Sequence, residues 1–156
     1  MVSYPKVIIY TDGSCLGNPG AGGYCALMFV KHNGKVMSRK IVGGEDDTTN
    51  NRMELTAVCT ALEALKTCCD VQFYLDSEYV EKNYINAPHW KLKGWKHNSG
   101  PVKNADLWER FLNAVNQTRS IITVNHVDAH TGIKYNEQCD TLARAEASRR
   151  KQALSR

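Results

Sequence analysis

The stretch VIIYTD, residues 7–12, is an apolar run that ends on a carboxylate, and VQFYLD, residues 71–76, repeats this arrangement. Continuous apolar runs of this length are typical of buried strands. If the two strands are parallel neighbours, Asp12 and Asp76 lie side by side at the carboxyl end of the sheet. Ligands gather at that edge in open α/β sheets. The two runs therefore predict an α/β fold with a site where these strands end.

The composition is that of an ordinary soluble globular protein, with 42% hydrophobic and 23% charged residues in 156. This length predicts one domain over residues 1–156, with flexible ends at about 1–5 and 150–156. No apolar run approaches the roughly 20 residues of a membrane span, and the first residues lack a signal-peptide layout. We therefore expect a cytoplasmic protein with no membrane partner, and, because nothing in the sequence requires a dimer, a monomer. The six cysteines show no paired zinc-binding spacing and are expected to be reduced thiols.

The other elements follow from periodicity and turn signals. Asn33-Gly34 lies between strand-like runs over 24–30 and 35–42, which predicts a hairpin and an antiparallel meander of three strands. A polar loop is expected over 45–49. Helices are expected from Asn51 to about Lys66, from Ser77, around His89–Leu92, over 106–116 and from about Asn136 toward Arg150, with a last strand over 120–127. This order predicts a mixed five-stranded sheet, three antiparallel strands and then two parallel, flanked by helices.

Four carboxylates lie where an acid is hard to explain by structure alone. Asp12 and Asp76 end strands, Glu54 falls on the apolar face of a helix, and Asp140 opens the last helix. Each has an ordinary alternative: Asp12 can form a turn, Glu54 can complete a capping box with Asn51, and the other two can favour a helix N-terminus. Those alternatives do not explain why all four occupy strand ends and inward helix faces. Oxygen ligands without a Cys/His cluster suit one or two Mg²⁺ or Mn²⁺ ions, which can promote phosphodiester displacement.

His130 lies in the loop between the last strand and the helix that carries Asp140. A lone loop histidine is most often a surface residue. One placed ten residues before a metal-binding aspartate can also carry protons, because its pKa lies near working pH. Both interpretations stay open on the residues alone.

A basic stretch lies between residues 82 and 105, with five lysines and no acid. Its charge is +5, so the rest of the chain, which has a net charge of +4 overall, sums to −1. Such a stretch on a near-neutral body is expected of a polyanion binder. Within it, tryptophans and lysines alternate: Trp90, Lys91, Lys93, Trp95 and Lys96. Lysines can neutralise phosphates while indoles pack on sugars, and the alternative is a solvated helix with two core tryptophans.

Six segments resemble bacterial type I ribonuclease H, in order and over nearly the whole chain. They are YTDGSCLGNPGAGGY (10–24), TTNNRMELTAVCTALEALK (48–66), DSEYV (76–80), GWK (94–96), PVKNADLWER (101–110) and NEQCDTLAR (136–144). The resemblance implies a ribonuclease H-like fold and Mg²⁺-dependent endonucleolytic hydrolysis of the RNA strand of RNA–DNA hybrids. It implies 3′-hydroxyl and 5′-phosphate ends. Recognition through 2′-hydroxyls and groove shape would make cutting largely independent of sequence.

The resemblance also implies roles for individual residues. The metal-binding acids are Asp12, Glu54, Asp76 and Asp140, and His130 stands at the position of the catalytic histidine. Hybrid contacts are implied for Cys15, Asn18, Thr49, Asn50 and Asn51, with Thr49 helping to hold a DNA phosphate. The family's basic protrusion maps onto residues 89–103, which include Trp90, Lys91, Lys93, Trp95 and Lys96.

Three residues depart from the family pattern. Asp128 stands where a lysine is expected, Leu75 where a small hydroxyl residue is common, and Glu78 where glutamine is common. We expect weaker substrate contact or a shifted metal optimum. The rival functions are a related-fold DNA nuclease or resolvase and a catalytically weak hybrid-binding module. The basic stretch argues against the first, and the presence of all four acids argues against the second.

Overall fold

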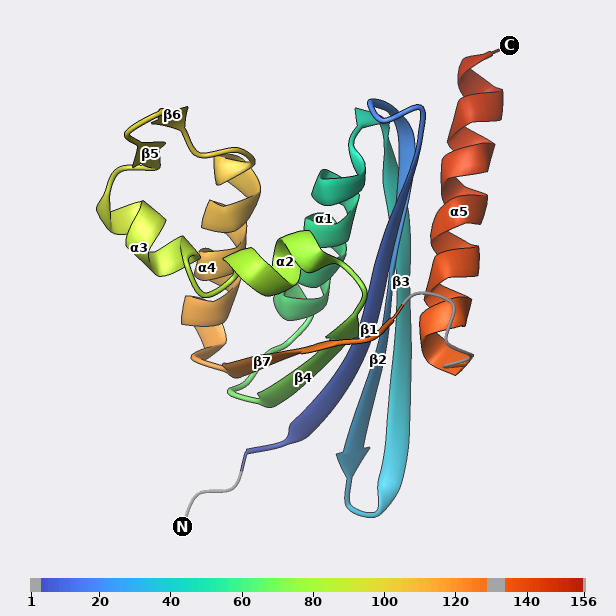
Figure 1. The fold of residues 1–156 in the computed structure, drawn as a ribbon. Coiled ribbons are helices and arrows are strands. Elements are labelled where there is room, and N and C mark those ends of the chain that lie inside the picture. Colours follow the sequence, from blue (N-terminus) through green and yellow to red (C-terminus); the bar gives the residue numbers. More distant parts are fainter. Residues whose placement is uncertain (1–3, 129–133, 156) are drawn as a thin grey trace.

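The computed structural model describes residues 4–128 and 134–155. The elements in chain order are β1 (Lys6–Leu16), β2 (Gly20–His32), β3 (Lys35–Thr48), α1 (Asn50–Glu63), β4 (Asp70–Leu75), α2 (Glu78–Asn83), α3 (Ala87–Leu92), β5 (Lys96–His97), β6 (Gly100–Pro101), α4 (Ala105–Thr118), β7 (Ile121–His126) and α5 (Lys134–Leu154). Figure 1 shows a central sheet with helices on both sides. The predicted α/β fold is confirmed.

The main sheet has five strands in the order β3-β2-β1-β4-β7. Its first three strands pair antiparallel, and β4 pairs parallel with both β1 and β7. The predicted division into antiparallel and parallel strands is therefore confirmed. At the predicted hairpin turn, Asn33 (φ 52°) and Gly34 (φ 76°) both have positive φ, the backbone that a tight two-residue turn requires.

Strand β3 is longer than predicted, because it continues to Thr48 through the segment 45–49 that we expected to be a loop. Its last residues pair with the glycine-rich start of β2. The strand lies at the edge of the sheet and most of its side chains are exposed. Polar residues are tolerated at an exposed edge, so polarity alone was a poor guide to where this strand ends.

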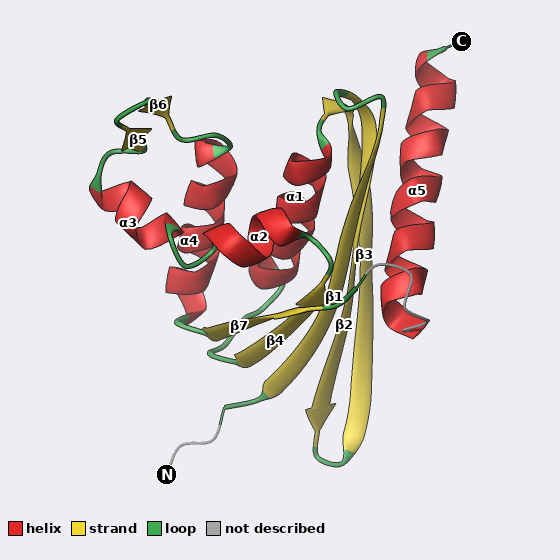
Figure 2. Ribbon diagram, in the orientation of Figure 1, coloured by secondary structure: helices red, strands yellow, loops and turns green. Residues whose placement is uncertain are grey.

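Helices α1 and α5 lie on opposite faces of the sheet, and α4 packs against α1 on the side away from the sheet (Figure 2). Alternate side chains of β1 and β4 point to the α1 face, where they form the main core. Members of this core include Val7, Ile9, Leu55, Val58, Val71 and Phe73. A smaller buried cluster between β2 and α5 consists of Cys25, Leu27, Cys139 and Ala143. Among the helices of the described ranges, none is both long and apolar enough to cross a bilayer.

Two helix ends differ from the prediction. Thr49, not Asn51, is the N-cap of α1, and its hydroxyl accepts a hydrogen bond from the Arg52 backbone N–H at 3.2 Å. Three capping residues follow one another here, and the first of them is already extended (φ −130°, ψ 163°) as the chain leaves β3. At the other end of the chain, α5 continues to Leu154, beyond the predicted end near Arg150.

Candidate active site

The register of β1 against β4 brings two of the predicted acids together. Tyr10 pairs with Tyr74 in the parallel ladder, and Asp12 and Asp76 each follow two residues later. Asp12 is still inside β1, opposite Cys25 of β2, and is only 3% exposed. Asp76 follows the last residue of β4 and is half-buried. The two carboxylates therefore lie side by side just beyond the paired part of β1 and β4, as the sequence predicts.

Helix α1 brings the third acid, Glu54, to the same place because Gly13 allows α1 to approach β1 closely. A Cβ at residue 13 would lie 2.5 Å from the Glu54 backbone nitrogen and 2.6 Å from the Met53 carbonyl carbon. No side chain fits in that space, so glycine is required for this contact.

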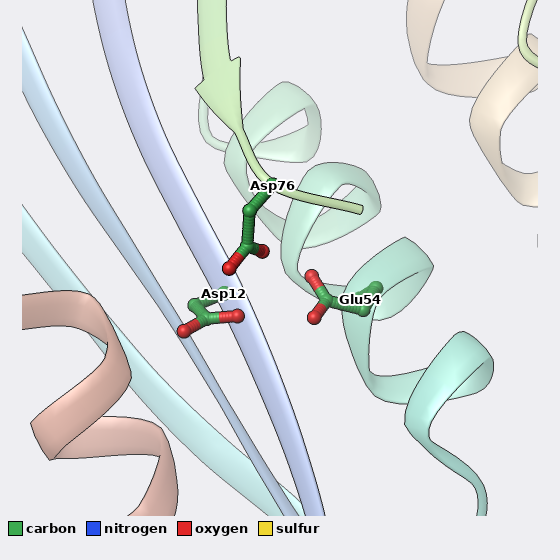
Figure 3. A group of neighbouring side chains, drawn as sticks. All are labelled: Asp12, Glu54 and Asp76. Atoms are coloured by element: carbon green, nitrogen blue, oxygen red, sulfur yellow. The ribbon is translucent and has the colours of Figure 1, made fainter. Parts of the chain in front are cut away.

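Oxygen atoms of Asp12, Glu54 and Asp76 all lie within 4.8 Å of one another. Figure 3 shows the three side chains pointing toward one another from β1, α1 and the end of β4. Three segments that lie 22 to 64 residues apart in the sequence thus converge on one point. Three carboxylates at this distance repel one another unless protons or a cation compensate their charge.

The electrostatics of the cluster reflect this repulsion. Burial, together with the charges of Asp76 and Asp140, raises the pKa of Asp12 to about 7, although a hydrogen bond from Glu54 opposes the rise. The backbone N–H of Gly13 also donates to Asp12 Oδ1 at 2.9 Å. Burial and the neighbouring Asp12 charge hold the pKa of Glu54 well above its usual range. Both shifts favour the protonated carboxyl and reflect the cost of burying several negative charges together without a cation.

The donor set fits a hard divalent cation. All its ligand atoms are carboxylate oxygens, which Mg²⁺ and similar ions prefer. Glu54 Oε2 is shielded from solvent and has no hydrogen-bond partner. A buried acceptor without a donor is costly, and a bound cation would compensate both this oxygen and the mutual repulsion of the three carboxylates.

Asp140 reaches the same pocket but lies outside the compact group of three. The pocket has a volume of about 440 Å³, and its walls include Asp12, Glu54, Asp76 and Asp140. Asp140 is carried by α5 and accepts a hydrogen bond from Arg144 Nε at 3.1 Å, one helical turn away. The structure thus brings all four predicted acids to one pocket, with the fourth held by an ion pair.

The sequence also singled out the loop histidine and three residues that depart from the family pattern. His130 lies outside the described residues. Asp128 has an ion-pair contact with His126 Nε2 at 3.5 Å. Leu75 is fully buried in the core, while Glu78 lines the acidic pocket and pairs with Lys82 at 3.3 Å. Leu75 therefore faces the core, and of these three departures Glu78 is the one in the pocket lining.

A second pocket of about 430 Å³ lies next to the acids. Its lining consists of Asn18, Thr49, Asn50, Asn51, Lys103 and Asn104. The Asn18 side-chain oxygen accepts a hydrogen bond from the Asn50 backbone N–H at 2.9 Å, which ties the glycine-rich turn to the start of α1. Four of the predicted hybrid contacts thus share one surface. Asn50 and Asn51 also line the acidic pocket, so the two pockets are continuous there.

Asn104 was not among the residues that we expected to contact substrate, and Lys103 was expected only as the last residue of the basic protrusion. Asn104 precedes α4 with left-handed backbone dihedrals (φ 58°), a conformation that asparagine tolerates well. It accepts a hydrogen bond from Arg52 Nη1 at 3.2 Å and donates one to the Tyr79 hydroxyl at 3.0 Å. A left-handed turn is hard to predict from one asparagine, so no simple sequence signal placed this side chain in the pocket.

Cys15 lies apart from both pocket linings. Its thiol donates to the backbone carbonyls of Thr48 at 3.3 Å and Gly20 at 3.5 Å. In this structure the thiol therefore joins β1 to the end of β3.

The predicted protrusion comprises α3, the two-stranded ribbon β5–β6 and the loops between them. Trp90 packs edge-on against Trp108 (centroids 6.0 Å apart) and against His97 (5.6 Å), and Trp95 packs against the core. Both tryptophans are half-buried, so they support the protrusion as well as forming part of its surface. The lysines at 91, 93 and 96 are exposed. Lys91 contacts Glu109 at 3.4 Å.

The close approach of α1 at Gly13 leads to a prediction. Gly13→Ala should displace α1 from β1, lower the free energy of unfolding by about 1–3 kcal/mol and weaken divalent-cation binding, because Glu54 moves with the helix. Urea unfolding and calorimetric Mg²⁺ titration measure the two effects. Gly34→Ala is the matched control: a Cβ there contacts nothing within 4 Å, so only local turn strain is expected. Unchanged cation binding in Gly13→Ala would contradict this role of the glycine.

Comparison with known proteins assigns the chain to a family. The sequence model of the RNase H family matches residues 4–148. Ribonuclease H of Cupriavidus pinatubonensis is 49% identical over 140 residues, which cover 88% of this chain and 92% of that protein. Ribonuclease HI of Xylella fastidiosa strain Temecula1 is also 49% identical over 140 residues, covering 88% of this chain and 89% of the relative. The crystal structure of LC9-RNase H1 superposes with a TM-score of 0.82 at 32% identity, covering 96% of this chain and 75% of that one. This chain belongs to the ribonuclease H family.

Proposed function

We propose that this ribonuclease H cuts the RNA strand of RNA–DNA hybrids with one or two Mg²⁺ ions held by Asp12, Glu54, Asp76 and Asp140. Mn²⁺ is the expected substitute ion. The observation that carries the proposal is the convergence of three carboxylates within 4.8 Å in a pocket open to solvent. The family of the chain specifies the reaction as hydrolysis, and we expect 3′-hydroxyl and 5′-phosphate products.

The residues of the chain have distinct parts in this reaction. When bound, the cations supply Lewis-acid charge to the scissile phosphodiester and lower the pKa of the attacking water. Asp12 and Glu54 would hold the cations through their carboxylate oxygens, in the ionised form. Asp76 is more exposed than Asp12, so it faces the side from which substrate enters. His130 is the proposed carrier of the proton that leaves with the product.

The second pocket is suited to a phosphate of the DNA strand. Amides, a threonine hydroxyl and one lysine line it, and such groups bind phosphate oxygens without reading sequence. Asn104 and Lys103 join Thr49 and Asn18 in this proposed role. Asn50 and Asn51 lie between the two pockets, where both strands of a hybrid would pass. Cys15 is also a proposed hybrid contact, on the basis of the family resemblance alone.

The lysines of the protrusion are proposed to hold the hybrid backbone. Replacing Lys91, Lys93 and Lys96 together by Ala should weaken hybrid binding at any sequence and flatten its salt dependence. Each lost phosphate contact reduces the slope of log K against log salt by about 0.9. We expect a total reduction of about two, because Lys91 is partly engaged with Glu109. Fluorescence anisotropy at several salt concentrations measures the slope.

The matched control for the protrusion is a triple Lys→Ala change on the distant β2–β3 hairpin, at Lys31, Lys35 and Lys40. These lysines are exposed and their replacement removes the same net charge. We expect the control to change the slope much less. Equal effects of the two triple variants would show that the protrusion has no special part in binding.

A substrate panel tests the proposed function. The protein with Mg²⁺ should cut RNA in an RNA–DNA hybrid and spare duplex DNA and duplex RNA. Equal cutting of duplex DNA would favour the rival DNA nuclease, and binding of hybrid without cutting would favour the hybrid-binding module. We further propose that residues 1–156 act as one domain, as a monomer in the cytoplasm, where the six free thiols would stay reduced.

A further inference from the structure

Asn136 is a buried polar residue beside the acids whose side chain has no evident structural task. It is the third residue of α5, only 3% exposed, and lines the same pocket as Asp12 and Asp140. Its Oδ1 atom is shielded from solvent and has no hydrogen-bond partner. Asparagine is a poor helix former unless its side chain caps or bonds the backbone.

The unpaired oxygen of Asn136 resembles that of Glu54. In the part of the chain that the structure describes, buried side-chain oxygens without a partner occur in Thr11, Thr48, Glu54, Glu109 and Asn136. The Glu54 and Asn136 oxygens belong to residues of the acidic pocket. Both atoms can accept hydrogen bonds, and each lacks a positive or hydrogen-bearing partner in this structure. A buried acceptor without such a partner destabilises the fold, and it calls for a ligand.

The spacing along α5 places Asn136 beside Asp140. Residues 136, 140 and 144 recur every four positions, so they share one helix face, and all three line the pocket. Arg144 compensates the charge of Asp140 through the 3.1 Å ion pair. Asn136, on the other side of Asp140, has no such partner for its Oδ1 atom.

We propose that Asn136 is a further cation ligand, whose neutral side-chain oxygen would bind the cation held beside Asp140. The proposal rests on the proposed cation site. Amide oxygens are common partners of hard cations, and a neutral donor adds no charge to a pocket where four carboxylates already repel one another. The cation in turn supplies the positive partner that the buried oxygen lacks.

Calorimetric titration with Mg²⁺ alone, without hybrid, tests the proposal. Asn136→Leu removes the oxygen at nearly constant volume and should weaken Mg²⁺ binding about tenfold, the lower end of what supporting groups of metal sites contribute. The melting temperature of the metal-free variant should rise, because an unpaired buried polar group is gone. Asn136→Asp keeps an oxygen at this position and should retain Mg²⁺ binding. Gln138→Ala, on the exposed side of the same turn, is the control and should match the wild type.

Two results would overturn the role of Asn136. One is Mg²⁺ binding in Asn136→Leu equal to the wild type. The other is loss of Mg²⁺ binding in Asn136→Asp, because that variant keeps an oxygen at the same position. Asp12→Asn separates this proposal from the one on which it rests. If Asp12→Asn binds Mg²⁺ as the wild type does, the cation site itself is wrong. If Asp12→Asn loses binding and Asn136→Leu does not, only the role of Asn136 fails.

Discussion

Asp12→Asn will abolish RNA cleavage while leaving hybrid binding intact. The substitution removes one carboxylate ligand from the centre of the cluster and changes neither the size of the side chain nor the acceptor for the Gly13 N–H. Loss of about 4 kcal/mol of cation-dependent stabilisation of the transition state corresponds to a rate decrease of about 10³-fold. The substitution removes a negative charge from the pocket and so reduces its repulsion of the negatively charged hybrid. Hybrid binding should therefore be equal or slightly tighter. Single-turnover cleavage and anisotropy with the same labelled hybrid measure the two properties.

The matched control for this variant is Asp46→Asn. Asp46 is an exposed aspartate of β3 that pairs with Arg150, so the same chemical change occurs away from the pocket. We expect wild-type cleavage from this control. Retained turnover in Asp12→Asn would show that the carboxylate at residue 12 does not hold an essential cation.

The metal-free protein will lose stability as the pH rises from about 4 to about 8. Burial and neighbouring acids raise the folded-state pKa of Asp12 from an ordinary value of 3.8 to about 7. Between these values the folded state binds more protons than the unfolded state, so the free energy of unfolding falls with rising pH. Asp12 alone accounts for about 4 kcal/mol of this decrease. Glu54 acts in the same direction, because its pKa is also raised.

Asp12→Asn should therefore raise the stability of the metal-free protein at pH 8 by a few kcal/mol and flatten its pH dependence. Urea unfolding in EDTA between pH 4.5 and 8.5 measures both. Asp106→Asn is a control of opposite sign, since the ion pair with Arg52 lowers the pKa of Asp106. That control should slightly lower stability at neutral pH. A stability of the metal-free wild type that rises between pH 5 and pH 8 would contradict the raised carboxyl pKa values.

Mg²⁺ should reverse this loss in the wild type. A cation that binds only the folded state stabilises it in proportion to the logarithm of its concentration above Kd. At pH 8 the melting temperature of the wild type should rise with added Mg²⁺, whereas that of Asp12→Asn should change little. Asp12→Asn should thus lose cleavage activity and gain stability in the metal-free protein.

The sequence predicted the arrangement of the acids well, because strand ends are readable from apolar runs. VIIYTD and VQFYLD are short, continuous and end on aspartate, and a parallel pairing of them leaves few ways to separate Asp12 from Asp76. The position of Glu54 also followed from helical periodicity. These are local patterns whose geometry is nearly fixed by backbone hydrogen bonding.

The features that were missed depend on tertiary contacts. Thr49, Asn50 and Asn51 are all residue types that can cap a helix. Thr49 caps α1 because the chain leaves β3 with Thr49 in an extended conformation. The second pocket includes Asn104, which comes from the start of a distant helix and has an unusual backbone conformation. Asn104 and the pocket residues at the start of α1 belong to different elements, so no sequence spacing predicts that they lie together.

The unusual residue Asp128 also has a structural partner. His126 lies between Glu81 of α2, at 2.8 Å from Nδ1, and Asp128, at 3.5 Å from Nε2. The acid that replaces the expected lysine thus lies beside a histidine ring nitrogen. The effect of Asp128 on the metal optimum remains a prediction from the sequence.

Anomalous diffraction from crystals soaked in Mn²⁺ tests the cation site most directly, because it locates the ion without relying on activity. We predict an anomalous peak in the acidic pocket within coordination distance of an Asp12 carboxylate oxygen, with further oxygens from Glu54 and Asp76. The peak should be absent from crystals of Asp12→Asn treated in the same way. A wild-type crystal with no peak in this pocket, or with its Mn²⁺ bound only elsewhere, would contradict the assignment of these carboxylates as the metal centre.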